Sequence, residues 1–242
     1  ALTYASYAQS HPEELRIVGV ADPILLRREK VAALYDLPPE RCFATAEDLA
    51  AQPRLADCVI NGTMDHQHVP TALPLLEAGY DMLLEKPFAT HEEEMWRLVQ
   101  AARRLGRTVA ICHVLRYTPH FKKMRELVQS GVLGQIVQVD HRENVSFWHM
   151  AHSYVRGNWR NREQSSPMIL AKCCHDLDIL PWVLGQKATK LASVGSLIHF
   201  KPENAPEEAP KRCLDGCPAA ETCPYYAPHL YLEMAPFWNS IA

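Results

Sequence analysis

The first half of the sequence alternates short apolar runs with longer amphipathic stretches, and this alternation constrains the fold more than any other feature. The apolar runs lie at residues 15–21, 57–61, 81–84 and 108–113, and the helical stretches at residues 24–37, 67–78 and 92–105. Strands separated by helices of this length predict a parallel, doubly wound sheet with right-handed crossovers. The continuous apolar character of the runs predicts strands that are buried on both faces.

The pattern changes after about residue 114. Thr118 and Pro119 open a predicted helix that runs to about residue 130, and Ser166 and Pro167 form a good N-cap and N1 pair for another that ends at Gly185. Apolar and polar residues alternate at 135–147 and 189–200, which predicts strands, whereas the proline-rich residues 202–228 predict irregular structure. We expect an α/β domain over residues 1–114 and a substrate and oligomerisation α+β domain, with a mainly antiparallel sheet, over 115–242.

The composition is that of an ordinary globular protein. The 242 residues carry a formal net charge of -3, with no block of Lys and Arg interleaved with aromatic residues. No apolar run approaches the roughly 18 to 20 residues that span a bilayer. We therefore expect no nucleic-acid partner, no membrane partner and a cytoplasmic location. Five of the eight cysteines fall in predicted strands, helices or their edges, where a free thiol behaves as a small buried hydrophobe.

Lys86 stands directly after the predicted strand 81–84, between Glu85 and Pro87. Ligands of open α/β sheets gather at the carboxyl ends of the strands, so a lysine there is placed for proton transfer or substrate orientation. The alternative is a solvated Glu-Lys pair at a strand end.

Asp22 occupies a similar place at the end of the predicted strand 15–21. In dinucleotide-binding folds, an acid at this point binds a ribose 2′-hydroxyl and favours NAD over NADP. Asp-Pro is also a common turn opener, and the nearby Arg27 and Arg28 offer positive charge for a phosphate. The residues therefore favour NAD without excluding NADP.

Lys172, His175 and Asp178 follow one another at intervals of three in the predicted helix 167–184. Lys172 and His175 can project from one helical face. A histidine can exchange a proton with a substrate hydroxyl, and a cationic lysine beside it lowers the His pKa and stabilises an oxyanion. The alternative is a buried histidine satisfied by Asp178 or by a carbonyl.

A cysteine cluster lies in the irregular tail. Cys213, Cys217 and Cys223 have the spacing C-x3-C-x5-C, and His229 follows. Soft ligands of this kind can hold zinc, but the spacing is not that of paired C-x2-C knuckles. A reduced loop-stabilising cluster and a disulfide are the alternatives, and we predict no metal site.

Eight short elements together resemble the Gfo/Idh/MocA family of nicotinamide-dependent oxidoreductases. In chain order they are Val20-Ala-Asp22-Pro, Asn61-Gly-Thr63-Met-Asp-His-Gln-His68, Ala78-Gly79, Glu85-Lys86-Pro87, Arg116-Tyr-Thr-Pro119, Gly131-Val-Leu-Gly134, Gly157-Asn-Trp159-Arg160 and His175-Asp-Leu-Asp178. The resemblance runs from about residue 1 to 200. It implies an N-terminal Rossmann domain and a second α/β domain with a large open sheet, with substrate between them.

The resemblance also implies roles for particular residues. Lys86 would assist hydride transfer, the peptide bond before Pro87 would be cis, and His175 would act as acid and base on the reacting hydroxyl. Trp159 and Arg160 would approach the nicotinamide or the substrate. The remaining cofactor contacts that the resemblance implies are Asp22, Thr63, His68 and Glu85, together with Lys86 itself.

Three departures from the family pattern stand out. The first strand and the G-x-G-x-x-G turn are absent from this sequence, which we interpret as a fragment of a longer protein whose second-domain sheet also stops short. Ala171 stands where many relatives carry an aspartate four residues before the histidine, and Lys172 is expected to take over part of that role. The third departure is the cysteine-rich insert at 213–223.

We therefore expect an NAD(P)-dependent dehydrogenase or reductase that acts on CH–OH groups of a sugar, cyclitol or related polyol. His113, Arg116, Asn158 and Asp178 are the expected substrate contacts, with Lys86, His175 and Lys172 as the catalytic groups. A homo-oligomer through the second-domain sheet is expected. The alternatives are a non-catalytic sugar-binding or regulatory homologue and an NAD-using glycosidase of the same family.

Overall fold

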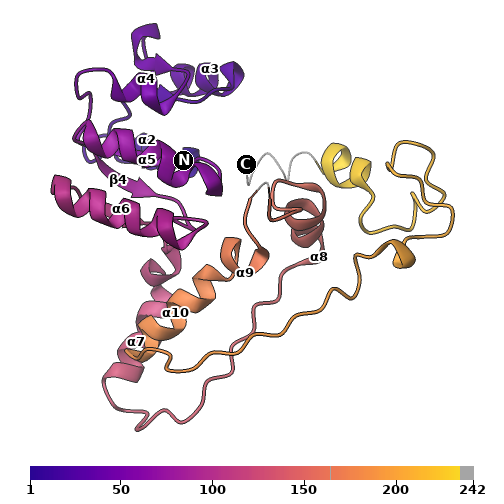
Figure 1. Ribbon diagram of the computed structural model, residues 1–242. Helices are drawn as coiled ribbons and strands as arrows, with labels where there is room; N and C mark the ends of the chain where they lie inside the picture. The colour runs from indigo at the N-terminus through magenta and orange to yellow at the C-terminus, as the bar shows by residue number, and fades with distance from the viewer. Residues whose placement is uncertain (164, 235–242) are drawn as a thin grey trace.

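Five short strands form two parallel sheets in the computed structural model, which describes residues 1–163 and 165–234. β1 (Val20–Ala21) pairs with β2 (Cys42–Phe43), and β3 (Cys58–Asn61), β4 (Asp81–Leu84) and β5 (Val109–Ile111) form the second sheet with β4 in the centre. All three strand pairs are parallel, and Leu84 lies beside Asn61 on one side and Ile111 on the other. The predicted parallel sheet is confirmed, and its last register places residues 85–87 at the carboxyl end of β4 (Figure 1).

The beginning of the chain differs from the prediction. The expected strand at 15–21 is reduced to β1, and β2, which the sequence did not indicate, lies beside it. No strand of the described residues joins β1 to β3, so the two sheets stay separate. The short β2 follows a 3₁₀ turn at Pro39–Arg41, and a two-residue strand carries too little periodicity to be read from sequence.

Ten α-helices and several 3₁₀ or π turns are formed by the described residues. The helices are α1 (Leu2–Ala5), α2 (Tyr7–Ser10), α3 (Leu25–Leu34), α4 (Ala46–Ala50), α5 (His68–Glu77), α6 (Glu92–Leu105), α7 (Pro119–Gln129), α8 (Phe147–His149), α9 (Met168–Ala171) and α10 (Cys174–Leu184). The 3₁₀ turns are η1 (Pro39–Arg41), η2 (Asp65–Gln67), η3 (Val114–Tyr117) and η5 (Pro202–Asn204), and the π turns are η4 (Met150–Arg156) and η6 (His229–Glu233).

The ends of two long helices follow their sequence signals. α6 begins with three glutamates, which favour the positive end of the helix dipole, and ends at Gly106 in the left-handed conformation with φ 62°. α7 begins at Pro119, and the Thr118 hydroxyl accepts a hydrogen bond from Phe121 N as predicted for an N-cap.

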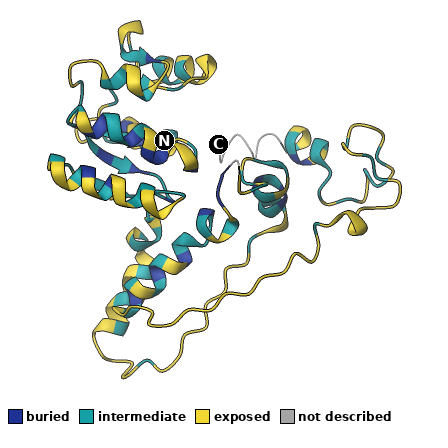
Figure 2. Cartoon of the chain, viewed as in Figure 1, coloured by how far each residue is buried: buried dark blue, intermediate teal, exposed yellow. Residues whose placement is uncertain are grey.

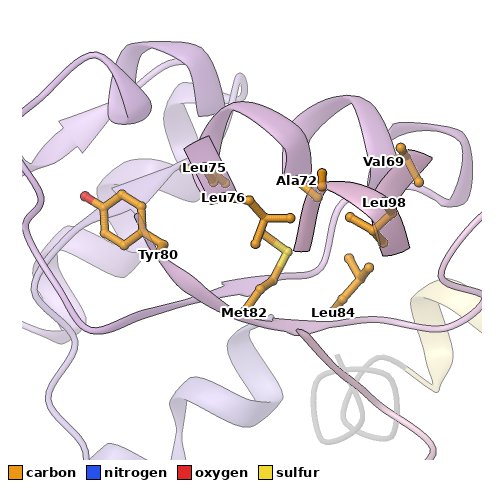
Figure 3. Close-up of a cluster of buried hydrophobic side chains, with 9 residues drawn as sticks. Val69, Ala72, Leu75, Leu76, Tyr80, Met82, Leu84 and Leu98 are labelled. Atoms are coloured by element: carbon orange, nitrogen blue, oxygen red, sulfur yellow. The ribbon is translucent and has the colours of Figure 1, made fainter. Parts of the chain in front are cut away.

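The largest hydrophobic core lies where α5 and α6 cover the three-stranded sheet (Figure 3). Leu76, Ala72 and Leu84 are fully buried at 0% exposure. Burying a side chain of leucine size contributes roughly 1.5–3 kcal/mol, so this cluster dominates the stability of the N-terminal half. Its members are Val69, Ala72, Leu75, Leu76, Tyr80, Met82, Leu84, Leu98 and Ala101.

The second half has a helical part and an extended part. α7 packs against α10, whereas residues 135–146 and 186–198 run as long extended segments without regular structure (Figure 1). Both segments are mostly exposed, including Val137 at 92% and Val194 at 99% (Figure 2). The predicted strands at 135–147 and 189–200 are therefore wrong for the described residues, and their antiparallel sheet is not formed there. An extended segment becomes a strand only when a neighbouring chain takes up its backbone hydrogen bonds.

The predicted helix 167–184 is divided in two. α9 ends at Ala171, the backbone leaves the helical path at Lys172 and Cys173, and α10 starts at Cys174. The expected Ser166 cap is also absent, because the Ser166 hydroxyl donates to Asp65 Oδ2 at 2.6 Å instead. This contact draws the start of α9 to the loop after β3.

Candidate functional site

Lys86 lies at the carboxyl end of β4 and reaches across to the second half of the chain. Its ammonium donates to the Ala171 carbonyl at the end of α9, with 2.8 Å between Nζ and O. Its backbone N–H donates to the Glu85 side chain at 2.9 Å, and the Lys86-Pro87 peptide bond is cis as the resemblance implied. Among the described residues, no carboxylate lies within ion-pair distance of the Lys86 ammonium, so this half-buried cation is not neutralised by a salt bridge.

His68, a predicted cofactor contact, is buried between two loops and bonded to the backbone. The side chain is 1% exposed, Nδ1 lies 2.7 Å from the Pro87 carbonyl oxygen, and Nε2 lies 2.9 Å from that of Thr63. Both ring nitrogens are thus occupied by the backbone, which leaves neither for a cofactor. His68 therefore holds the loop after β3 against the loop after β4.

Thr63 stands on the loop after β3 and is exposed. Its hydroxyl donates to Asn61 Oδ1 at 2.9 Å, and Asn61, which is 4% exposed, also donates to the Thr71 hydroxyl at 2.9 Å. The buried amide of Asn61 therefore fixes the start of this loop, and Thr63 stays a candidate cofactor contact.

Asp22 follows β1, and one of its carboxylate oxygens accepts from Ile24 N at 2.8 Å. This is the turn-opening role that the Asp-Pro pair also predicted. The Arg28 side chain donates to the Asp22 backbone carbonyl, which places its positive charge beside the strand end. An acidic and a basic side chain thus lie together at the carboxyl end of β1.

His175 and His113 face one another with their ring centroids 6.0 Å apart and their planes at 84°. Burial lowers the pKa of His175, and the charges of Lys86, His113 and Lys172 lower it further. Burial also lowers the pKa of His113, against the opposing effect of Asp178. Both rings are therefore neutral near pH 7. The Nδ1 atoms of both are buried and make no hydrogen bond with any described residue, so each has bonding capacity left for a ligand.

Lys172 makes an ion pair with Glu143, which lies on the extended segment 135–146. Next to it, His141 Nε2 lies 2.6 Å from Asp176 Oδ1. The ligand atoms of His141, Glu143 and Asp176 lie within 4.8 Å of one another, a set of donors that could hold a divalent cation. The Lys172 ammonium already supplies positive charge at Glu143. Lys172 lies between α9 and α10, and its charge is one of those that lower the pKa of His175.

Arg116 and Asp178, both expected to contact substrate, are bonded to each other. Arg116 Nε donates to Asp178 Oδ2 at 2.7 Å, and Nη2 donates to the other carboxylate oxygen. Hydrogen bonding to Asp178 raises the pKa of the Arg116 guanidinium. Asp178 also lies 3.7 Å from His113 Nδ1. The Arg116 and Asp178 side chains are thus paired with each other beside His113, and their contact with substrate stays a prediction.

The segment with Asn158, Trp159 and Arg160 docks on the loop after β3. Trp159 Nε1 donates to Asp65 Oδ2 at 2.9 Å, and the Asn158 amide lies 3.6 Å from Met64 Sδ. Arg160 is exposed. Trp159 therefore joins the two halves of the chain at Asp65, and Arg160 keeps an exposed guanidinium beside this junction.

Several residues of the site escaped the sequence analysis. Asp65 is 4% exposed and holds both Trp159 and Ser166, although Asp in a polar loop gives no signal of burial. His149 is a further neutral imidazole, because burial and the charges of Lys172, His152 and Lys86 lower its pKa. The others are Tyr4, His141, Glu143 and Asp176, all brought in by contacts across the chain.

The cysteine cluster stays apart from this site. Cys213, Cys217 and Cys223 are free thiols in the irregular segment 205–228. In the part of the chain that the structure describes, the converging group of metal-ligand side chains contains none of them. Their function is not connected to Lys86 or His175 by any described contact.

Two family models match the chain. The model described as "Oxidoreductase family, NAD-binding Rossmann fold" matches residues 2–113, and the one described as "Oxidoreductase family, C-terminal alpha/beta domain" matches residues 125–222. The matches follow the change of architecture after β5, and the fold therefore combines a Rossmann NAD-binding domain with a C-terminal α/β domain.

The chain is also similar to individual oxidoreductases. The chain is 27% identical over 218 residues to the oxidoreductase YteT of Bacillus subtilis, covering 82% of this chain and 50% of YteT. It is 29% identical over 175 residues to the inositol 2-dehydrogenase of Corynebacterium glutamicum, covering 69% and 48%. The WlbA dehydrogenase of Bordetella pertussis, solved with NADH and UDP-GlcNAcA, superposes with a TM-score of 0.57 at 21% identity, covering 72% of this chain and 49% of WlbA. The chain thus spans about half the length of the relatives it matches.

Proposed function

Since the chain belongs to the Gfo/Idh/MocA oxidoreductase family, we propose that it forms the catalytic part of an NAD(P)-dependent dehydrogenase or reductase. The substrate would be a sugar, a cyclitol or a related polyol with a reacting CH–OH group. The likeness to the inositol 2-dehydrogenase of Corynebacterium glutamicum supports this substrate class. The observation that carries the proposal is the hydrogen bond from the Lys86 ammonium to the Ala171 carbonyl at 2.8 Å, which holds this cation at the end of α9, four residues before His175. The Lys86 charge also lowers the pKa of His175, after the larger effect of burial.

His175 is suited to accept the hydroxyl proton of the substrate. Its lowered pKa keeps the ring neutral near pH 7, and its buried Nδ1 is without a protein partner among the described residues. A buried polar atom without a partner costs about 1–3 kcal/mol, which a bound hydroxyl would recover. We propose that His175 takes this proton during oxidation and returns it during reduction.

Lys86 is suited to stabilise the oxygen that loses the proton. Its ammonium is fixed by the Ala171 carbonyl and lacks a counter-ion among the described residues. A fixed positive charge in a half-buried site stabilises a developing alkoxide more than it does the neutral hydroxyl. The nicotinamide supplies the hydride acceptor or donor when it is bound.

Apart from the Lys86 ammonium, the side chains of the site are paired or neutral, which fits an uncharged polyol. Arg116 is neutralised by Asp178 and Lys172 by Glu143. His113, His149 and His175 have lowered pKa values and are neutral near pH 7. A neutral imidazole has one N–H donor and one acceptor nitrogen, so this group of rings matches hydroxyl groups, which are also both donors and acceptors.

The described residues fit the sugar portions of a dinucleotide. Asp22 and Thr63 lie at or after the carboxyl ends of β1 and β3, which is where ligands of α/β sheets bind. Asp22 favours a ribose 2′-hydroxyl and thus NAD, whereas Arg28 beside it could meet the 2′-phosphate of NADP. We propose NAD as the preferred cofactor, held by Asp22, Thr63, Glu85 and Lys86.

The test is reduction of NAD and of NADP by the purified protein with inositols and hexoses, and the reverse reaction with their keto derivatives. Lys86→Ala should lower kcat about a hundredfold or more, as removal of a transition-state charge does. Lys190→Ala on the extended segment 186–198 is the matched control and should leave kcat unchanged. Cofactor and sugar binding without any turnover would refute the proposal and identify a sugar-binding homologue instead.

A further inference from the structure

Tyr4 lies outside every role assigned so far, yet its hydroxyl reaches the residue that precedes Lys86. Tyr4 Oη donates to Glu85 Oε1 at 2.7 Å, across 81 residues of sequence. We propose that Tyr4 is a positioning residue for Lys86 and acts through the Glu85 carboxylate. The inference rests on the function proposed above only in that Lys86 is taken as the group that acts on substrate.

The Glu85 carboxylate accepts the hydrogen bond of the Lys86 backbone N–H in place of a carbonyl of a neighbouring strand. Glu85 N still donates to Asn61 O at 2.9 Å and continues the ladder between β3 and β4. The next amide, Lys86 N, donates to Glu85 Oε2 at 2.9 Å. One carboxylate oxygen therefore fixes the Lys86 backbone, and the other is held by Tyr4.

The chemistry of Tyr4 suits a permanent donor. Burial raises its pKa above the ordinary value, and hydrogen bonds with Glu85 and Cys112 raise it further. The phenol therefore keeps its proton at any pH at which the protein would work. Hydrogen bonds from a neutral donor to a carboxylate are roughly twice as strong as those between neutral groups.

The network joins three elements at the carboxyl edge of the sheet. Tyr4 comes from α1, Glu85 follows β4, and Cys112, which is 4% exposed, follows β5. Glu85 precedes Lys86, and Pro87, which follows Lys86, is held by His68 through its carbonyl oxygen. Without the Tyr4 hydroxyl, the Glu85 side chain loses its anchor and is free to leave Lys86 N or to approach the Lys86 ammonium.

Either movement displaces the Lys86 charge from the place fixed by the Ala171 carbonyl. Misplacement of a catalytic group by about 1 Å can cost up to about a hundredfold in rate, and we expect Tyr4→Phe to lower kcat about tenfold. The KM for the polyol should stay within about twofold, because the variant removes no proposed substrate contact.

Tyr7→Phe is a matched control. The Tyr7 hydroxyl donates to Glu14 at 2.7 Å, the same kind of bond at the same length, but Tyr7 is 43% exposed and its partner is far from Lys86 in the sequence. This variant should leave kcat and KM unchanged. The double variant Tyr4→Phe/Glu85→Gln tests whether Tyr4 acts through the Glu85 carboxylate. Its kcat should equal that of Glu85→Gln alone, because Tyr4→Phe should cause no further loss of kcat once the carboxylate is gone.

A second measurement does not depend on turnover. Lysines methylated with ¹³C give separate NMR signals, and the Lys86 signal is identified by its absence from Lys86→Arg. Tyr4→Phe should shift the Lys86 signal, whereas Tyr7→Phe should not. Glu85→Gln should shift the same signal and replaces Tyr4→Phe in this experiment if that variant does not fold.

The outcomes separate the two proposals. An unmoved Lys86 signal in Tyr4→Phe and Glu85→Gln overturns the positioning role, and so does equal loss of kcat in Tyr4→Phe and Tyr7→Phe. A shifted Lys86 signal in a protein that turns over no polyol supports the positioning role while the proposed dehydrogenase function fails.

Discussion

The three-stranded sheet and the extended segments 135–146 and 186–198 were both predicted to be β-structure, yet only the first forms it. β3, β4 and β5 lie beside one another and are covered by α5 and α6. In contrast, the extended segments carry apolar residues that face solvent, with Leu191 at 74% exposure. Apolar β-branched sequence therefore specifies a strand only where a neighbouring strand and a covering helix are both supplied nearby in the chain.

Amide hydrogen exchange tests the difference between the three-stranded sheet and the two extended segments most directly. In the 242-residue chain, amides of β4 are predicted to be protected about ten-thousandfold or more, because they open only with the core. Amides at 135–146 and 186–198 have no backbone partner among the described residues and should exchange nearly as fast as in a peptide. Mass spectrometry of peptic fragments measures both. Strong protection at 186–198 would show that this segment finds a partner strand in solution.

Two leucine-to-alanine variants compare the core and an extended segment by their free energies of unfolding. Leu76→Ala empties a site of 0% exposure in the core and should lower the free energy of unfolding by about 2–5 kcal/mol. Leu191→Ala removes the same atoms from an exposed position and should change it by less than about 0.5 kcal/mol. Urea unfolding followed by far-UV circular dichroism measures both. Equal losses would mean that Leu191 is buried in solution.

The sequence predicted the helices and strands that depend on local periodicity and on contacts between segments close together in the chain. α6 was predicted at its observed bounds, α7 begins at Pro119 as predicted, and β3 to β5 pair as the βα alternation requires. Each of these is determined by residues within about one helical turn or by the next βα unit. The place of Lys86 after the end of a strand was predicted in the same way.

Contacts between distant segments were not predictable in the same way. Arg116 and Asp178 were both recognised as polar residues of the site, but only the packing of η3 against α10 reveals that they neutralise each other. His68 was expected to bind cofactor because the sequence does not show that both its nitrogens meet backbone carbonyls. Tyr4 and Asp65 gave no signal, since their roles arise from partners about 80 and 100 residues away.

At the Lys172–Glu143 ion pair an extended segment contacts the proposed catalytic residues, and the smallest expected effect arises there. Lys172 is one of the charges that lower the His175 pKa, so Lys172→Gln should raise that pKa. In the proposed reaction, His175 must be neutral to accept the hydroxyl proton, so activity should be lost as the pH falls through the His175 pKa. The acid limb of the kcat/KM profile should therefore move to higher pH in Lys172→Gln. Lys187→Gln, on the exposed segment after α10, is the control and should leave the limb in place.

The direction of this shift distinguishes a charge effect from a loss of structure. A variant that merely loosened the site would expose His175 to water, which also raises its pKa, but it would lower kcat on the plateau as well. Lys172→Gln should keep the plateau because the Lys86 ammonium is held by the Ala171 carbonyl and not by Lys172. Glu143→Gln removes the partner but keeps the Lys172 charge, so it should leave the limb at its original pH or move it to lower pH. If Lys172→Gln and Glu143→Gln both moved the acid limb to higher pH, the extended segment would be affecting the pKa of His175 through its packing. Residues 141–143 would then be a packed part of the structure, unlike the rest of the exposed segment.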